Sequence, residues 1–438
     1  MAFAIDGLVS GLQTTSMIDS LMKIEAMPQT LLKGKVSATQ SIVTALQALN
    51  SKVADLATLA GKTAKAGALD LYKASSSSTD VTATVASPST TGQIEMVVDK
   101  LAQAQNVVSD ALAAWPDTNI TITSASGVAT PIAAASTSLD DVVSAINSAD
   151  AGVRAVKVAA GGGLYRVQLT AAETGVAGGF TISGTTASFT EIRAAQDAQA
   201  VMWKGTAAET TITSSTNTFS DLLPGVGVTV SAVSADPVTV TVTRDDAKIS
   251  ATASSLISGV NDLLAFISVK TAVTNSTDAS GAPKVSGGIF TGDSTVRDVQ
   301  QKILSAASAP VGGRSPSEFG ISITRTGTME FDADKFSAAL AADPAATQAA
   351  VQEIASRIQT VAAAASDKYD GQITSKITGQ QSLLKDMGGQ ITDWDQRLSV
   401  RRSSLERTYA ALEVALSRMN SQSSWLTGQL ASLPTNQS

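Results

Sequence analysis

The stretch ITGQQSLLKDMGGQITDWDQRLSVRRSSLERTYAALEVALSRMNSQSSWLTGQLASL, residues 377–433, decides the fold of this chain. Every seventh residue in it is apolar, which is typical of a long helix with one buried stripe. The stripe consists of Ile377, Leu384, Ile391, Leu398, Leu405, Leu412, Met419, Leu426 and Leu433. At 1.5 Å per residue such a helix would be about 85 Å long, so the pattern predicts a rod rather than one helix of a globular bundle.

The pair Gly388–Gly389 interrupts this stretch without changing the phase of the stripe. A loop would be free to shift the phase, so we expect one continuous helix, weakened there by about 2 kcal/mol relative to two alanines. The flank beside the stripe is apolar near Trp394 and again near Leu416, but it is polar between them, at Arg401 and Arg402. We therefore expect the helix to pack within its own chain for part of its length and against other molecules for the rest.

The beginning of the chain carries a similar repeat. Two neighbouring apolar series between residues 42 and 60 predict a coiled coil that stops near Gly61. Its packing residues are Ile42, Leu46, Leu49, Val53 and Leu56. Nearer the N-terminus, a looser stripe that includes Ile5, Leu8 and Leu12 is mixed with glycine, serine and threonine, so we expect that segment to be helical only when docked.

Between residues 69 and 243 the apolar period changes from seven to two. Alternating valine and threonine suit half-buried strands. The predicted strands are Val81–Val85, Ile94–Val98, Asn119–Thr123, Tyr165–Leu169, Val226–Val230 and Val238–Val242. We expect short helices at Ser138–Ser148 and Glu191–Ala200 to interrupt them.

Helical spacing returns at Asp245 and extends to Ile267. Shorter helical patterns occupy Ser294–Ala307 and Ala345–Ala365, and a Gly, Ser and Thr-rich loop is predicted at Asn275–Gly288. The dipeptide Thr326–Gly327 between two short apolar runs predicts a hairpin.

Together these patterns predict an α+β fold, in which a long coiled-coil and helical stalk from both chain ends carries inserted β-rich head domains. The predicted segments are a docking segment that is flexible when free (1–41), the first arm of the stalk (42–98), a β-rich head of one or two subdomains (99–244), the return arm (245–370), and a long coiled-coil helix with a second docking segment (371–438).

Composition argues against an enzyme. The chain has no Cys and no His, which removes thiol chemistry, disulfides and the commonest general base and metal ligand. The carboxylate pairs Asp140–Asp141 and Asp245–Asp246 stand where helices are predicted to begin, Asp332 and Asp334 have no third ligand, and residues 161–163 precede a strand as a turn would. We expect no catalytic residue, no cofactor and no metal.

Charge and hydropathy restrict the partners further. The net charge of −7 argues against a general nucleic-acid-binding surface. The sequence contains no run of about 18 apolar residues, so we predict no membrane span. The N-terminus lacks the basic and apolar regions of a secretory signal peptide. We expect a cytoplasmic protein or one that is exported without cleavage of a signal.

Five ordered segments resemble one family. They are IDGLVSGL at 5–12 followed by IDSLM at 18–22, VDKLAQAQ at 98–105, NTFSDLLPGV at 217–226, TGDSTVR at 291–297, and Gly320–Ile321 with GTMEFD at 327–332. In these segments and their order the chain resembles the bacterial flagellar filament cap protein family, also called flagellar hook-associated protein 2.

The resemblance implies a secreted, extracellular protein at the distal tip of the bacterial flagellar filament. It implies passage through the flagellar type III export apparatus, with an export chaperone, and assembly into a closed homo-oligomer of about five subunits. It also implies that flagellin folds and is inserted beneath this cap, and that hook–filament junction proteins are further partners in motility.

The apolar stripes at both chain ends need a partner, so we expect them to form the filament or oligomer interface. Its residues are Ile5, Leu8, Leu12, Leu412, Met419, Leu426 and Leu433. Two alternatives remain at the level of sequence: a stalked surface adhesin whose Thr-rich head serves cell adhesion, and another exported axial component of the junction or tip.

Overall fold

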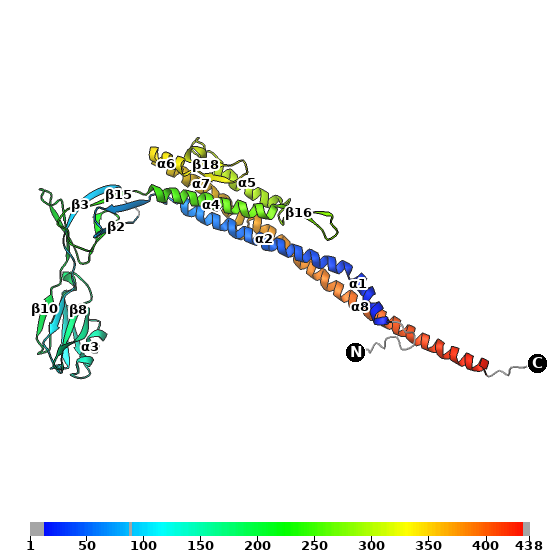
Figure 1. Ribbon diagram of the computed structural model, residues 1–438, viewed down its shortest axis with the longest axis horizontal. Helices are drawn as coiled ribbons and strands as arrows, with labels where there is room; N and C mark the ends of the chain where they lie inside the picture. The colour runs from blue at the N-terminus through cyan, green and yellow to red at the C-terminus, as the bar shows by residue number, and fades with distance from the viewer. Residues whose placement is uncertain (1–12, 87–89, 432–438) are drawn as a thin grey trace, which may run out of the picture. The chain divides into compact units, whose positions relative to one another are not determined.

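The computed structural model describes residues 13–86 and 90–431, with long helices towards both ends of the chain and strands in the middle (Figure 1). The chain divides into a helical unit, Met1–Lys65 with Thr252–Ser438, and a β unit, Ala66–Ala251. The predicted α+β class, with helical ends and an inserted β-rich head, is confirmed.

The divisions in the structure differ from two predicted boundaries. The β unit begins at Ala66 and not at residue 99, because the strands between residues 72 and 100 pair with strands from the far end of the insertion. The predicted boundary between residues 41 and 42 falls inside one helix, α2 (Met27–Ala64).

Helix α2 is the longest element of the N-terminal part of the helical unit. It begins with Pro28 in its first turn, where the missing N–H breaks no helical hydrogen bond. Its buried stripe includes Val43, Leu46, Leu49, Val53, Leu56 and Ala60, whereas Ile42 is half-buried. Helix α2 packs against α7 (Pro344–Ser366) and α8 (Gln372–Ala431).

The predicted stop of α2 at Gly61 is wrong, because the helix continues to Ala64. Ala60 and Thr63 on either side of the glycine are buried, and a glycine inside a helix costs only about 1 kcal/mol. Packing on both sides of Gly61 therefore outweighs the local preference to end the helix.

Helix α8 is continuous across Gly388–Gly389, as the unbroken phase of the stripe predicts. The predicted helices near 294–307 and 345–365 are also confirmed, as α5 (Ser294–Ser308) and α7. The remaining elements here are α4 (Asp246–Thr271), η2 (Pro316–Phe319), β18 (Ile321–Ile323), β19 (Met329–Phe331) and α6 (Ala333–Ala342). Strands β18 and β19 form the predicted hairpin.

Helix α4 alone, among the described residues, is long and apolar enough by length and composition to cross a membrane. Its apolar residues are nevertheless part of the helical unit's core: Leu256, Val260, Leu263 and Ile267 are all buried. A Cβ on Gly259 would lie 2.8 Å from a methyl carbon of Leu59, so a side chain there would collide with α2. This helix is therefore packed as a core helix, which agrees with the prediction of no membrane span.

The predicted loop at Asn275–Gly288 is wrong. Strands β16 (Val273–Thr277) and β17 (Pro283–Gly287) form an exposed antiparallel hairpin. The Asp278 carboxylate accepts hydrogen bonds from the backbone N–H groups of Ser280 and Ala282, at 2.8 and 2.9 Å, and these bonds hold the turn. A composition typical of loops here encodes a tight turn between two short strands.

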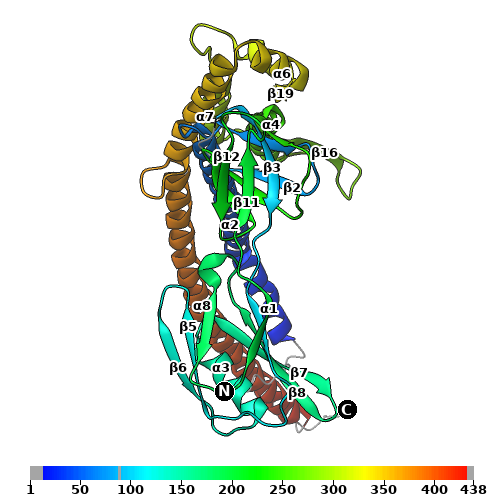
Figure 2. The same ribbon diagram turned by 90° about the vertical axis from the view of Figure 1, so that its left-hand side faces the viewer.

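The β unit contains two hydrophobic cores, and Figure 2 shows the strands of each gathered in its own group. The first core lies between a five-stranded sheet, β1-β15-β3-β11-β12, and a three-stranded sheet, β13-β14-β2. These strands are β1 (Tyr72–Ser76), β2 (Val81–Val85), β3 (Gly92–Lys100), β11 (Ala198–Met202), β12 (Thr210–Ser214), β13 (Thr218–Leu223), β14 (Val226–Val230) and β15 (Val238–Arg244).

The second core lies among a four-stranded sheet, β10-β4-β8-β7, a three-stranded sheet, β6-β5-β9, and helix α3. Its elements are β4 (Asn106–Ser109), β5 (Asn119–Ser124), β6 (Ala129–Ala133), α3 (Leu139–Ser148), β7 (Val153–Gly161), β8 (Leu164–Ala171), η1 (Val176–Gly178), β9 (Phe180–Ser183) and β10 (Phe189–Arg193). All six predicted strands are present in the two cores.

Of the two short helices predicted in the β unit, one is confirmed and one is wrong. Ser138 caps α3, and its side chain accepts a hydrogen bond from the backbone of Asp140. Residues 191–193 instead belong to β10 and residues 198–200 to β11, and these strands pair with β4 and β3. Strand pairing across the sheets overrides the weak local helical pattern of that segment.

Candidate functional site

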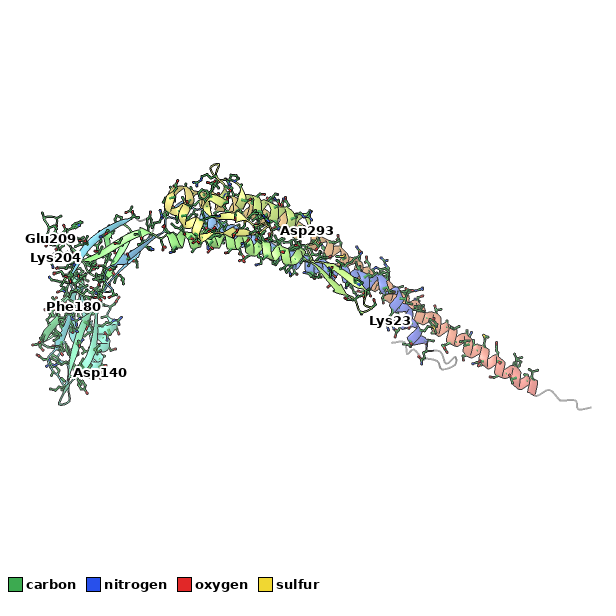
Figure 3. All side chains as sticks on the ribbon, turned by 45° about the horizontal axis from the view of Figure 1, so that its top comes forward. Lys23, Asp140, Phe180, Lys204, Glu209 and Asp293 are labelled. Carbon is green, nitrogen blue, oxygen red and sulfur yellow. The ribbon has the colours of Figure 1, made fainter. Side chains whose placement is uncertain are left out.

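The terminal stripes predicted to form an interface lie on α8 and on the segment that precedes α2. Helix α1 (Thr14–Glu25) runs antiparallel to α8, as the order of their contacts shows. The Tyr409 hydroxyl lies 3.1 Å from the sulfur of Met17, and the Arg401 guanidinium lies 2.8 Å from the Glu25 carboxylate. Figure 3 shows α1, with Lys23 labelled, beside α8.

Polar contacts align α8 with α1 and with the start of α2. The side-chain amide of Gln29, on α2, donates to the Asp395 carboxylate at 2.5 Å. The Arg402 guanidinium pairs with Asp19 and also with Glu406, the latter at 3.1 Å. Its hydrogen bond to Asp19 is the main reason that the pKa of Arg402 is raised above its ordinary value. The polar flank noted in the sequence is thus the place where α8 meets α1.

The sequence reasoning did not assign Asp19 and Glu25 as partners of these arginines. The signal was present, since the segment 19–25 carries two carboxylates and the polar flank of α8 carries adjacent arginines. Periodicity alone cannot say which of several charged segments lies opposite, because exposed ion pairs are too weak to choose a fold.

The apolar stripe of α8 becomes progressively more exposed towards its end. Ile377, Leu384, Ile391, Leu398 and Leu405 are half-buried. Beyond Tyr409, in the segment that we call distal α8 (residues 410–431), Leu412 is 42% exposed, Met419 65% and Leu426 53%. The other predicted interface residues, Ile5, Leu8, Leu12 and Leu433, lie outside the described residues.

Comparison with known families identifies the chain. The sequence model described as flagellar hook-associated protein 2 C-terminus matches residues 195–421, just over half of the chain. The chain belongs to the flagellar hook-associated protein 2 family. The N-terminal model of the same family matches residues 10–105, and the flagellin hook IN motif matches residues 119–173, which include β5 to β8.

Relatives and solved structures agree with this family along most of the chain. The flagellar hook-associated protein 2 of Escherichia coli O157:H7 is 28% identical over 97% of both chains. The B-type protein of Pseudomonas aeruginosa is 26% identical over 97% of this chain and 94% of its own. The crystal structure of the flagellar cap protein FliD D1-D2-D3 domains from Escherichia coli matches with a TM-score of 0.61 and 25% identity, over 77% of this chain and 99% of that one.

This hook-associated protein 2 family member is a flagellar filament cap protein, located at the distal tip of the filament in the extracellular part of the flagellum. The family is a family of structural cap proteins.

The carboxylates considered for chemistry have structural partners. Asp140 pairs with Lys157 at 2.8 Å, and Asp246 pairs with Arg244 at the start of α4. Asp332 caps α6 by accepting from the backbone of Lys335, and this bond is the main reason that the pKa of Asp332 is lowered. Within residues 13–86 and 90–431, no group of three or more His, Cys, Asp or Glu could hold a metal ion.

Proposed function

We propose that this cap protein docks on the filament end through the apolar stripes of its two chain ends. The docking residues are Ile5, Leu8, Leu12, Leu412, Met419, Leu426 and Leu433. The observation that carries the proposal is the exposure of Leu412, Met419 and Leu426 on distal α8, in a helix whose earlier stripe residues are half-buried.

A single helix with an exposed apolar stripe is only marginally stable in water until a partner covers that stripe. Isolated helices shorter than about 12–15 residues are marginal even with good helix formers, and most helical stability in proteins comes from packing of an apolar face. Distal α8 leaves its stripe residues exposed, so packing of this face within the chain contributes little to its stability. Docking would bury this stripe and stabilise the helix at the same time.

The proposal includes a closed homo-oligomer of about five subunits, beneath which exported flagellin folds and is inserted. Before assembly, the chain would pass through the flagellar export apparatus with the help of an export chaperone. Hook–filament junction proteins would lie at the other end of the same filament. A closed ring would suit this arrangement, because closure limits growth to one ring at one filament end.

The test is the double variant Leu426→Asp with Leu433→Asp, compared with Ser421→Asp with Ser424→Asp, which adds the same charge off the stripe. We expect the first variant to leave filament tips while its β unit stays folded, and the second to remain at the tips. Normal filament growth with the Leu426 and Leu433 variant would refute docking through this stripe.

A deletion experiment tests the cap activity as a whole. Without this chain, flagellin should appear in the medium as monomer, and cells should carry hooks without filaments. Normal filaments combined with lost surface attachment would contradict the proposed role in flagellin assembly and favour adhesion.

A further inference from the structure

Distal α8 and the turn before it carry a second exposed face beside the apolar stripe. At 3.6 residues per turn, Arg407, Val414, Arg418 and Trp425 share one side of the helix, about a third of a turn away from Leu412, Met419 and Leu426. We call these four residues the basic face. Val414 and Trp425 are each more than half exposed, so the apolar members of this face are as bare as the stripe itself.

The arginines of α8 differ in whether they contact other groups of the same chain. Between residues 397 and 431 the chain has five arginines and two glutamates, in a protein of net charge −7. Arg397 stacks over the ring of Trp394 at 5.3 Å, and Arg401 and Arg402 pair with the carboxylates of α1. The three arginines nearest the core of the helical unit are therefore engaged inside the chain.

The other two arginines, both on the basic face, are free for another molecule. Arg407 donates only to the carbonyl oxygen of Ser403, one turn earlier on the same helix. In the described part of the chain, neither Arg407 nor Arg418 forms an ion pair with a carboxylate. They stand eleven residues apart, which is about 16 Å along a helix at 1.5 Å per residue.

The basic face and the apolar stripe are separate surfaces of one helix. Arg407, Arg418 and Trp425 lie about a third of a turn from Leu412, Met419 and Leu426, on a helix about 10–12 Å across. A partner centred on the apolar stripe therefore leaves room for a second protein surface on the basic face.

We propose that the basic face binds a helical protein surface of the filament end that carries two carboxylates about 16 Å apart and an apolar recess for Trp425. Charge complementarity selects this partner: the free cations are guanidinium groups, which bind carboxylates through two parallel hydrogen bonds. The location of the partner rests on the proposed function, whereas its acidic chemistry rests on the basic face alone. A second copy of this chain fits less well, because Asp19, Glu25 and Glu406 beside distal α8 are already paired.

The experiment measures binding of the labelled full-length chain to the ends of purified filaments from the same bacterium, at low and at high salt. The test variant is R407E with R418E, and the matched control is R325E with K385E, which makes the same charge change at exposed sites elsewhere in the helical unit. We expect the test variant to bind about tenfold more weakly or worse at low salt, with a flatter salt dependence, because an arginine opposite a carboxylate becomes a like-charge pair. The control should bind as the unchanged chain does.

Two more variants separate charge from geometry. R407K with R418K keeps both charges but loses the two-pronged hydrogen bonding, so it should retain the salt dependence and bind more weakly than the unchanged chain. W425A should weaken binding with little change in salt dependence. Far-UV circular dichroism of each variant should match the unchanged chain, since the substituted side chains are exposed.

Four results would overturn the inference. They are unchanged filament binding by the R407E and R418E variant, a loss equal to that of the control, a change in self-association alone, and a loss of binding to phosphatidylglycerol vesicles alone. The last two would assign the basic face to a second copy or to lipid. If the unchanged chain does not bind filament ends at all, the proposed function fails as well, so the two failures can be told apart.

Discussion

Helix α2 and distal α8 carry the same kind of apolar repeat and have opposite surroundings. In α2 the stripe residues Leu46, Leu49 and Val53 are fully buried against helices of the same chain. In distal α8 the equivalent residues Leu412 and Met419 face solvent. A seven-residue repeat thus shows that a helix has a face to bury, but it does not show whether its partner is in the same chain.

The largest expected effect is a loss of stability that should differ between α2 and distal α8. Leu49→Ala should lower the free energy of unfolding of the helical unit by about 2–5 kcal/mol, because it empties a fully buried site. The same change at Leu426 should lower it by about 0.5 kcal/mol or less, since that side chain is exposed. Urea unfolding of the full chain measures both values. Equal losses would mean that distal α8 is already packed in the free protein.

The second prediction concerns the glycine pair between the two halves of α8. Gly388→Ala with Gly389→Ala should raise the stability of α8 by about 1–2 kcal/mol, because alanine favours the helix and a Cβ at either position meets no atom within 4 Å. Thermal unfolding of the double variant checks this. A loss of stability would indicate that a neighbouring molecule approaches the backbone there.

A smaller effect is expected where the buried and exposed parts of α8 meet. Asp19→Asn removes the carboxylate that pairs with Arg402, and exposed ion pairs of this kind contribute little to stability. Hydrogen exchange in α1 should become faster, with no change in α2. Unchanged exchange in α1 would show that the apolar contacts of Met17 and its neighbours hold α1 without the ion pair.

The smallest expected effect is on the acid unfolding of the β unit, which serves as a reference for the helical unit. The backbone N–H of Thr186 and the hydroxyls of Thr185 and Thr186 donate to the Asp117 carboxylate, and they lower its pKa. A lowered folded-state pKa stabilises the protein above the unfolded value of about 3.9, and this contribution is lost as the pH falls through the folded value. Asp117→Asn should therefore flatten the acid limb of unfolding in the β unit and leave α2 and α8 unaffected. A changed acid response in the helical unit would contradict this separation.

The elements whose pattern is long and repetitive could be predicted from the sequence. The unbroken phase across Gly388–Gly389 predicted the continuity of α8, and valine–threonine alternation predicted six strands of the β unit. Ordered motifs from residue 5 to residue 332 indicated the family. These features could be predicted because each depends on many residues that repeat one local preference.

Other features depend on a partner elsewhere in the chain and became visible only in the folded molecule. Pairing with β4 and β3 places residues 191–193 and 198–200 in strands, and packing around Ala60 and Thr63 carries α2 past Gly61. The fold also sets Asp19 and Glu25 opposite Arg402 and Arg401, which leaves Arg407 and Arg418 without a carboxylate among the described residues. The physical reason is that a local pattern fixes which face of an element is apolar or charged, whereas contacts between distant segments decide what that face meets.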